Sequence, residues 1–193
     1  MAKKIIAKAV RVITIPPLLV LSLLTLIYFV NDDAFRGLFD YLAAVICLAI
    51  IPSLAYVLQP ILPKFKDRGR NGQRELAFIM STVGYITGFV YAIVSGAPAH
   101  FKFIITAYLV SVVLLLIFNK LLRQKASGHA CGVSGPLLFA VYFLGWEWAI
   151  PCALIAVGVV WSSVFLSRHT PKELMLGSAC ALTAFVTVGI SIL

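Results

Sequence analysis

Two histidines stand at the edges of apolar stretches of this chain. His129 lies in SGHACGVSGP (127–136), and His169 lies in SRHTPKELMLG (167–177). A neutral imidazole can act as a nucleophile near pH 7, and an imidazolium can donate a proton in the same pH range. The two side chains are therefore suited to nucleophilic and acid–base catalysis, provided that the fold brings them into one site.

Glu173 follows His169 by four residues, a spacing that places two side chains on the same face of a helix. The carboxylate could then hold one nitrogen of the imidazole ring. The segment TPKE (170–173) is also typical of a helix start, in which Thr170 is the N-cap, a proline takes the first position and Glu173 closes a capping box. Both interpretations predict that a helix begins close to His169.

The composition places these residues in a membrane protein. Hydrophobic residues make up 62% of the chain and charged residues only 12%, whereas soluble domains are about one quarter charged. A globule of 193 residues cannot bury so much apolar surface, so we expect one all-α, polytopic transmembrane bundle over residues 1–193. Four scattered cysteines form no C-x-x-C pair, which argues against a zinc or redox site and favours buried thiols.

Seven apolar stretches are each close to the ~20 residues that a spanning helix needs. They cover residues 12–30, 38–62, 76–95, 102–119, 131–147, 150–167 and 172–193. The first has no small-residue cleavage site, so we expect a retained helix rather than a signal peptide. The fifth and sixth are joined only by GWEW (145–148) and could form one bent unit, so the bundle is expected to have six or seven helices.

Basic and neutral connections alternate along these helices. The N-terminal segment, the 63–75 loop, the 119–128 connection and the 167–172 turn are basic, whereas the other connections are nearly neutral or acidic. Seven spans would place all four basic segments on one side of the membrane, which the positive-inside rule assigns to the cytoplasm. Two spans separate His129 from His169, so both histidines are expected on this side, near the 63–75 loop.

Residues 162–177, SSVFLSRHTPKELMLG, resemble the third signature of the phosphatidic-acid-phosphatase type 2 (PAP2) family, which includes haloperoxidase-like phosphatases. The residues that match in spacing are Ser162, His169, Glu173 and Gly177. Glu173 stands where the family has aspartate, and Ser163 stands where it has arginine. The second signature, Pro-Ser-Gly-His, is similar to ASGH at 126–129, whereas the first has only a loose counterpart in the 63–75 loop.

The resemblance covers residues 120–193 well, and it implies a PAP2-like core and a phosphohistidine mechanism. It implies that His169 attacks phosphorus and that His129 protonates the leaving oxygen. Glu173 would fix the tautomer of the His169 ring and stabilise its positive charge. The residues expected to bind the phosphate oxygens are Ser127, Gly128, Lys66, Arg70, Arg74 and Arg168. The scheme requires no metal and no other cofactor.

The resemblance implies hydrolysis of a phosphomonoester or pyrophosphate of a lipid at the cytoplasmic surface of a membrane, which we expect to be a bacterial cell membrane. Candidate substrates are phosphatidic acid, phosphatidylglycerol phosphate and polyprenyl (pyro)phosphate. Ser163 removes one phosphate-binding donor, so the alternatives are a weak enzyme and a non-catalytic protein that binds or transports a lipid phosphate. The net charge of +9 is explained by cytoplasmic loops and anionic lipids, and we expect no nucleic acid partner.

Each of these residues also has a purely structural interpretation. The 63–75 loop can act as a topology determinant alone, His129 can be an interfacial residue, and Glu173 can be a capping residue. Two histidines at matched spacing on one side of the membrane favour a site instead. The deciding observation is whether the two imidazole rings face a common pocket.

Overall fold

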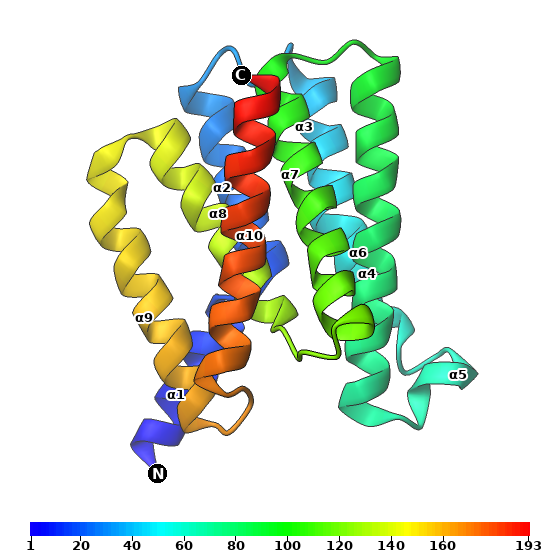
Figure 1. The fold of residues 1–193 in the computed structure, drawn as a ribbon, viewed down its shortest axis with the longest axis vertical. Coiled ribbons are helices and arrows are strands. Elements are labelled where there is room, and N and C mark those ends of the chain that lie inside the picture. The colour runs from blue at the N-terminus through cyan, green and yellow to red at the C-terminus, as the bar shows by residue number, and fades with distance from the viewer.

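A computed structural model describes all 193 residues, and every regular element in it is a helix (Figure 1). The helices are α1 (Ala2–Ile13), α2 (Pro16–Val30), α3 (Leu38–Val45), α4 (Ile51–Leu58), α5 (Pro63–Lys66), α6 (Gly69–Val94), α7 (Ala99–Leu116), α8 (Gly128–Leu144), α9 (Ala149–Phe165) and α10 (Pro171–Ile192). Wider π-helical turns continue α3 into α4 and extend α7 to Leu121. The predicted all-α fold is confirmed.

Five helical segments are long and apolar enough to cross a membrane. They are Leu38–Leu58, Gly69–Val94, Ala99–Leu121, Trp146–Phe165 and Pro171–Ile192. The bent pair α1 and α2 would make a sixth, and α8 is a shorter apolar helix of 17 residues. These lengths and compositions are those of an integral membrane protein.

The first predicted span, residues 12–30, is divided in the structure. Pro16 is the first residue of α2, and the preceding Ile15 is extended, with φ −63° and ψ 135°, as the residue before a proline prefers. The chain therefore bends by 51° between α1 and α2. The basic N-terminal residues form a separate amphipathic helix, α1, in which Lys3, Lys4 and Lys8 are exposed.

The connections alternate between the two ends of the bundle (Figure 1). The N-terminus, α5, the start of α6 and the α7–α8 and α9–α10 connections lie at the lower end in this view, which we call the basic end. The C-terminus and the connections near residues 31–37, 95–98 and 145–148 lie at the opposite end. All four basic segments of the sequence thus gather at the basic end.

The region predicted as the 63–75 loop is largely helical. Residues 63–66 form α5, and α6 already begins at Gly69, whose φ of +51° suits the chain reversal between the two helices. Gly72 packs directly against the carbonyl group of Phe65, which ties α6 to α5. The arginines of this region are therefore presented by a helix rather than by a flexible loop.

The close packing of α10 on α8 fixes the relative positions of the segments that carry His129 and His169. Phe101, Phe103 and Phe139 are almost fully buried in the core, where α10 packs on both α7 and α8. At the basic end, the carbonyl oxygen of Ser127 lies where a side chain on Gly177 would be, so only glycine fits there. The N–H of Ser127 also donates to the carbonyl of Glu173, with an N–O distance of 2.9 Å. The N-termini of α8 and α10 are therefore held side by side.

Candidate functional site

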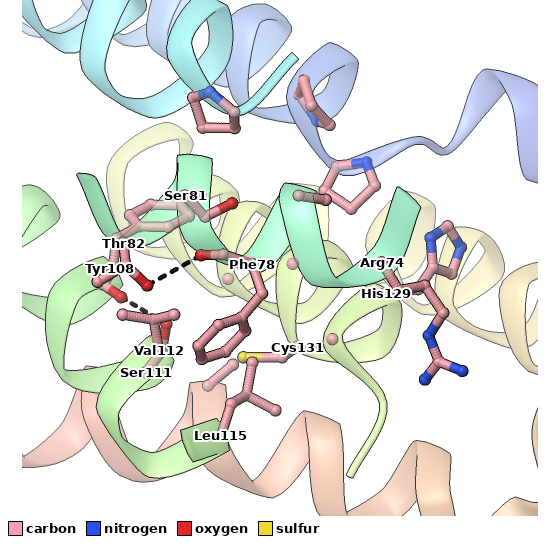
Figure 2. A pocket seen from close by; sticks show the side chains of 18 of the residues that line it. Arg74, Phe78, Ser81, Thr82, Tyr108, Ser111, Val112, Leu115, His129 and Cys131 are labelled. Carbon is pink, nitrogen blue, oxygen red and sulfur yellow. Dashed lines mark hydrogen bonds between the residues drawn. The ribbon is translucent and has the colours of Figure 1, made fainter. Parts of the chain in front are cut away.

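A cavity of about 1170 Å³ runs from the basic end into the bundle. Both His129 and His169 line it, and so do four arginines, Arg11, Arg70, Arg74 and Arg168. Figure 2 shows Arg74 and His129 together at one end of the cavity. The fold thus brings two histidines that are separated by two helices in the chain into the same hollow.

His169 lies in the turn between α9 and α10 and not on a helix face, which corrects the position that its spacing from Glu173 predicted. Ser167 has a left-handed φ of +51°, and Thr170 is the N-cap, whose hydroxyl accepts from the N–H of Glu173 at 3.2 Å. The His169 ring still reaches the side chain of Glu173, because Nδ1 and Oε2 are 2.7 Å apart. The carboxylate of Glu173 therefore holds the histidine, as predicted, and does not close the capping box, of which only the Thr170 half forms.

The carboxylate of Glu173 is fixed from two sides. Its Oε1 lies 2.9 Å from Nζ of Lys125, while its Oε2 accepts from the His169 ring. A carboxylate on Nδ1 keeps the proton on that nitrogen and leaves the lone pair of Nε2 free. Burial lowers the pKa of His169 below its ordinary value of 6.5, and Glu173 opposes this shift only in part. His169 is consequently a neutral imidazole at pH 7.

His129 lies in the first turn of α8. Its Nε2 is buried and has no hydrogen-bond partner within the protein, although the ring lines the cavity. The first N–H groups of a helix have no intrahelical acceptor, and they carry the positive end of the helix dipole. His129 and the neighbouring Gly128, which also lines the cavity, are therefore placed where an anion would be stabilised.

The four arginines come from three different parts of the chain. Arg70 and Arg74 belong to the first turns of α6, Arg168 to the α9–α10 turn, and Arg11 to the last turn of α1. Arg11 lies within electrostatic range of the other three. None of the four forms an ion pair with a carboxylate. The site thus concentrates positive charge that the protein itself does not neutralise, which favours the binding of a polyanion.

Two residues predicted to bind phosphate do not line the cavity. Ser127 is fully buried, and its hydroxyl accepts from the N–H of Ala130 as the N-cap of α8. Lys66 is exposed at the end of α5. Ser127 consequently shapes the site through the helix that it caps, and Lys66 faces solvent.

Arg11 and Lys125 belong to the site although the sequence did not single them out. Arg11 donates from Nη1 to the hydroxyl of Ser163 at 2.8 Å, and Ser163 is fully buried in α9. Lys125 lies two residues before Ser127 and pairs with Glu173. The signal for both was their place in basic segments that the topology assigned to one end, and only the packing of α1 on α9 identifies Arg11 as part of the site.

No protein-family model, no curated protein and no solved structure matches this sequence or fold. The chemistry of the cavity is therefore the basis for a functional assignment.

Proposed function

We propose that this protein is a divergent PAP2-type lipid phosphatase, which hydrolyses a phosphomonoester or pyrophosphate of a membrane lipid at the cytoplasmic surface. The observation that carries the proposal is the shared cavity. His169, held by Glu173, and His129, with an unpartnered Nε2, line it together with four arginines that have no carboxylate partner. A nucleophile, an acid and an anion clamp are the three parts that phosphoryl transfer requires.

In the first step, Nε2 of neutral His169 attacks phosphorus, and the bond from phosphorus to the ester oxygen breaks. The leaving oxygen takes a proton from the imidazolium form of His129 and departs as an alcohol, or as a phosphate if the substrate is a pyrophosphate. Burial and the nearby Arg11 lower the pKa of His129 to about 3 in the free protein. This step therefore requires the bound phosphate to raise that pKa, which it does by placing negative charge beside the ring. The positive charge that develops on His169 is stabilised by the carboxylate of Glu173 at 2.7 Å.

In the second step, water attacks the phosphohistidine. His129, now neutral, accepts a proton from the water, the bond from phosphorus to nitrogen breaks, and His169 returns to its neutral form. Inorganic phosphate is released. His129 thus acts as the acid in the first step and as the base in the second, and no proton is gained or lost by the protein.

The arginines would neutralise the phosphate oxygens throughout this cycle. Arginine is well suited to this task because its planar fork binds two oxygens at once. Ser163 stands where the PAP2 signature has arginine, and it is the residue that receives the hydrogen bond of Arg11. We infer that Arg11 supplies, from α1, the guanidinium that position 163 lacks.

The experiment is a phosphate-release assay on purified protein with phosphatidic acid, phosphatidylglycerol phosphate and polyprenyl (pyro)phosphate. We expect release that vanadate inhibits, that is lost in His169→Ala and that falls roughly 10²- to 10⁴-fold in His129→Ala. His100→Ala, which changes a histidine at the opposite end, is the matched control. An acid-labile phosphorylated intermediate should be trapped in wild type and be absent from His169→Ala.

Two outcomes contradict the enzymatic proposal. Tight binding of these lipids without phosphate release would instead indicate the non-catalytic lipid-phosphate binding protein. Release that survives in His169→Ala would show that the phosphohistidine scheme is wrong.

A further inference from the structure

Only one end of the cavity is charged. Beyond His129 and Arg74 the walls are formed mainly by apolar and aromatic side chains of α6, α7 and α8, as Figure 2 shows for Phe78, Val112 and Leu115. Such walls would suit a purely apolar ligand, except that one polar group faces this inner region. That group is the hydroxyl of Tyr108, which has no hydrogen-bond partner inside the protein.

Tyr108 lines the inner part of the cavity from α7. The residue is only 4% exposed, and its Oη is buried without any hydrogen-bond partner. Its ring is held by an edge contact with Tyr85 and by stacking on Phe139, with centroid distances of 5.5 and 6.0 Å. The phenol therefore cannot turn away to find an acceptor elsewhere without breaking this packing.

Two neighbouring hydroxyls, those of Thr82 and Ser111, are satisfied within their own helices. Thr82 donates to the carbonyl of Phe78 at 2.9 Å, and Ser111 donates to the carbonyl of Tyr108 at 2.7 Å (Figure 2). The unpaired state of Tyr108 is thus a particular feature of that side chain. Because buried donors in proteins are nearly always paired, this phenol requires an acceptor that enters the cavity.

The depth of Tyr108 can be measured along α8. Its Oη lies beside Gly135, 3.5 Å from where a Cβ atom would be, and Gly135 follows His129 by six residues. Six residues of α-helix rise by ~9 Å. A ligand whose phosphate is bound at His129 would therefore need a hydrogen-bond acceptor ~9 Å further into the cavity, which is close to the span from a lipid phosphate across its glycerol to an ester carbonyl.

We propose that the lipid bound here is an ester-linked glycerolipid phosphate, and that an ester carbonyl accepts a hydrogen bond from Tyr108. The inference rests on the proposed function for the position of the phosphate. It selects phosphatidic acid and phosphatidylglycerol phosphate over polyprenyl phosphates, because a prenyl chain has no acceptor at this depth. Binding a prenyl chain would leave the buried phenol unpaired, which is unfavourable.

The walls of the cavity also provide a route for the chains of such a lipid. Ile79 and Val83 of α6 line the cavity and keep a large part of their apolar surface exposed. An opening of the cavity between helices at these two residues would connect it with the space that membrane lipids occupy. The phosphate and glycerol of the ligand can lie inside while its acyl chains extend outward.

The test compares two ligands and two proteins by binding rather than by turnover. Dioctanoyl phosphatidic acid and its dialkyl ether analogue, which lacks the carbonyl groups, are titrated against wild type and Tyr108→Phe, each in the His169→Ala background to prevent hydrolysis. We expect the ester to bind roughly two- to tenfold more tightly than the ether in the Tyr108-containing protein. We expect this preference to disappear in Tyr108→Phe, while the affinity for farnesyl phosphate is unchanged.

The matched control is Tyr142→Phe, the same change on an exposed tyrosine outside the cavity, which should keep the ester preference. Equal affinity for ester and ether in the Tyr108-containing protein, or a preference that persists in Tyr108→Phe, overturns the proposal, and so does the absence of binding. Ester-selective binding without phosphate release by the protein with His169 intact would contradict the phosphatase and leave this site standing. Hydrolysis with no ester preference would support the phosphatase and overturn the proposed contact between Tyr108 and an ester carbonyl.

Discussion

Arginines at the two ends of the bundle have opposite electrostatic surroundings. At the opposite end, Arg36 donates from Nε and Nη2 to the two carboxylate oxygens of Asp40, each at 2.8 Å. Asp40 is 2% exposed and also accepts from the hydroxyl of Tyr91 at 2.7 Å. The third contact of Arg36 is the carbonyl of Ser95 at 2.6 Å. This arginine joins the segment before α3 to the end of α6, and its charge is neutralised within the protein.

At the basic end, four arginines converge and no carboxylate pairs with any of them. The carboxylate nearest the histidines, that of Glu173, is engaged by Lys125 and His169 instead. Like charges that are brought together destabilise a fold unless an opposite charge joins them. The comparison therefore separates two purposes of the same side chain: Arg36 stabilises the fold, whereas the cluster at the basic end has no internal counter-ion and forms the proposed anion-binding site.

The largest effect is expected from Glu173→Gln, which removes the negative charge that contacts His169, the proposed nucleophile. The rate should fall roughly 10²- to 10⁴-fold, because the positive charge on His169 is no longer stabilised. Glu173 raises the pKa of His169, so its loss lowers that pKa further. Since His169 must be neutral to attack, activity is lost as pH falls through this pKa, and the acidic limb of the pH–rate profile should move to lower pH.

Measured pH–rate profiles of wild type and Glu173→Gln check this prediction, with Glu147→Gln at the opposite end as the control. An acidic limb that stays in place would show that Glu173 does not act on the titrating group.

A second prediction compares the loss of one arginine from each end of the bundle. Arg74→Ala should lower kcat/KM roughly 10²- to 10³-fold, as loss of one preorganised donor does, without lowering the thermal stability, because it relieves repulsion. Arg36→Ala should do the reverse and lower Tm while activity is retained. Phosphate-release assays and thermal unfolding of both variants in the same detergent decide the matter. A loss of stability in Arg74→Ala comparable to that in Arg36→Ala would remove the distinction between the two ends.

A third prediction concerns the contact that aligns α8 with α10. In Gly177→Ala the new methyl group would collide with the carbonyl of Ser127 and push the two helix starts apart. A displacement of about 1 Å between catalytic groups can cost 10²-fold in rate, and we expect a loss of this order. The control is Gly158→Ala, where the added Cβ would meet only Val10 at an ordinary 3.7 Å. Full activity in Gly177→Ala would show that the alignment is not required.

The smallest effect on activity is expected from Asp40→Asn. The variant keeps the shape of the side chain but removes the charge that Arg36 and Tyr91 share, and the exposed position of Arg36 limits the loss of stability. Tm should fall by several degrees for a chain of this size, with an unchanged rate. Thermal unfolding of Asp40→Asn, Arg36→Ala and the double variant measures the coupling, and additive effects would contradict a direct pair.

Much of the fold could be predicted from the sequence because apolar stretches of spanning length leave few alternatives to helices. The errors occurred where charge was interpreted as irregular structure. Arg70 and Arg74 were assigned to a loop, but charged residues are compatible with the first turns of a helix that projects beyond its apolar part, as α6 does. The first span is predicted to begin at residue 12, whereas residues 2–13 form the separate helix α1 and α2 begins at Pro16.

The candidate site was accessible to sequence reasoning only where its parts are local. The contact between His169 and Glu173 spans four residues, and its spacing indicated it. The contact between Arg11 and Ser163 spans 152 residues and depends on how α1 packs on α9, which no short pattern encodes. The role of Tyr108 could not be predicted from the sequence either. A tyrosine in an apolar stretch is usually a lipid or core contact, and only the structure shows that its hydroxyl is unpaired.

A sideways opening beside Ile79 and Val83 would have a consequence for kinetics. A substrate that enters from the lipid phase never passes through bulk water, so its effective concentration is its mole fraction in the bilayer. Diluting the substrate with inert lipid at constant total substrate should then slow the reaction, whereas diluting the vesicles in buffer should not. The turnover rate would depend on the surface density of the substrate in the bilayer rather than on its concentration in bulk solution.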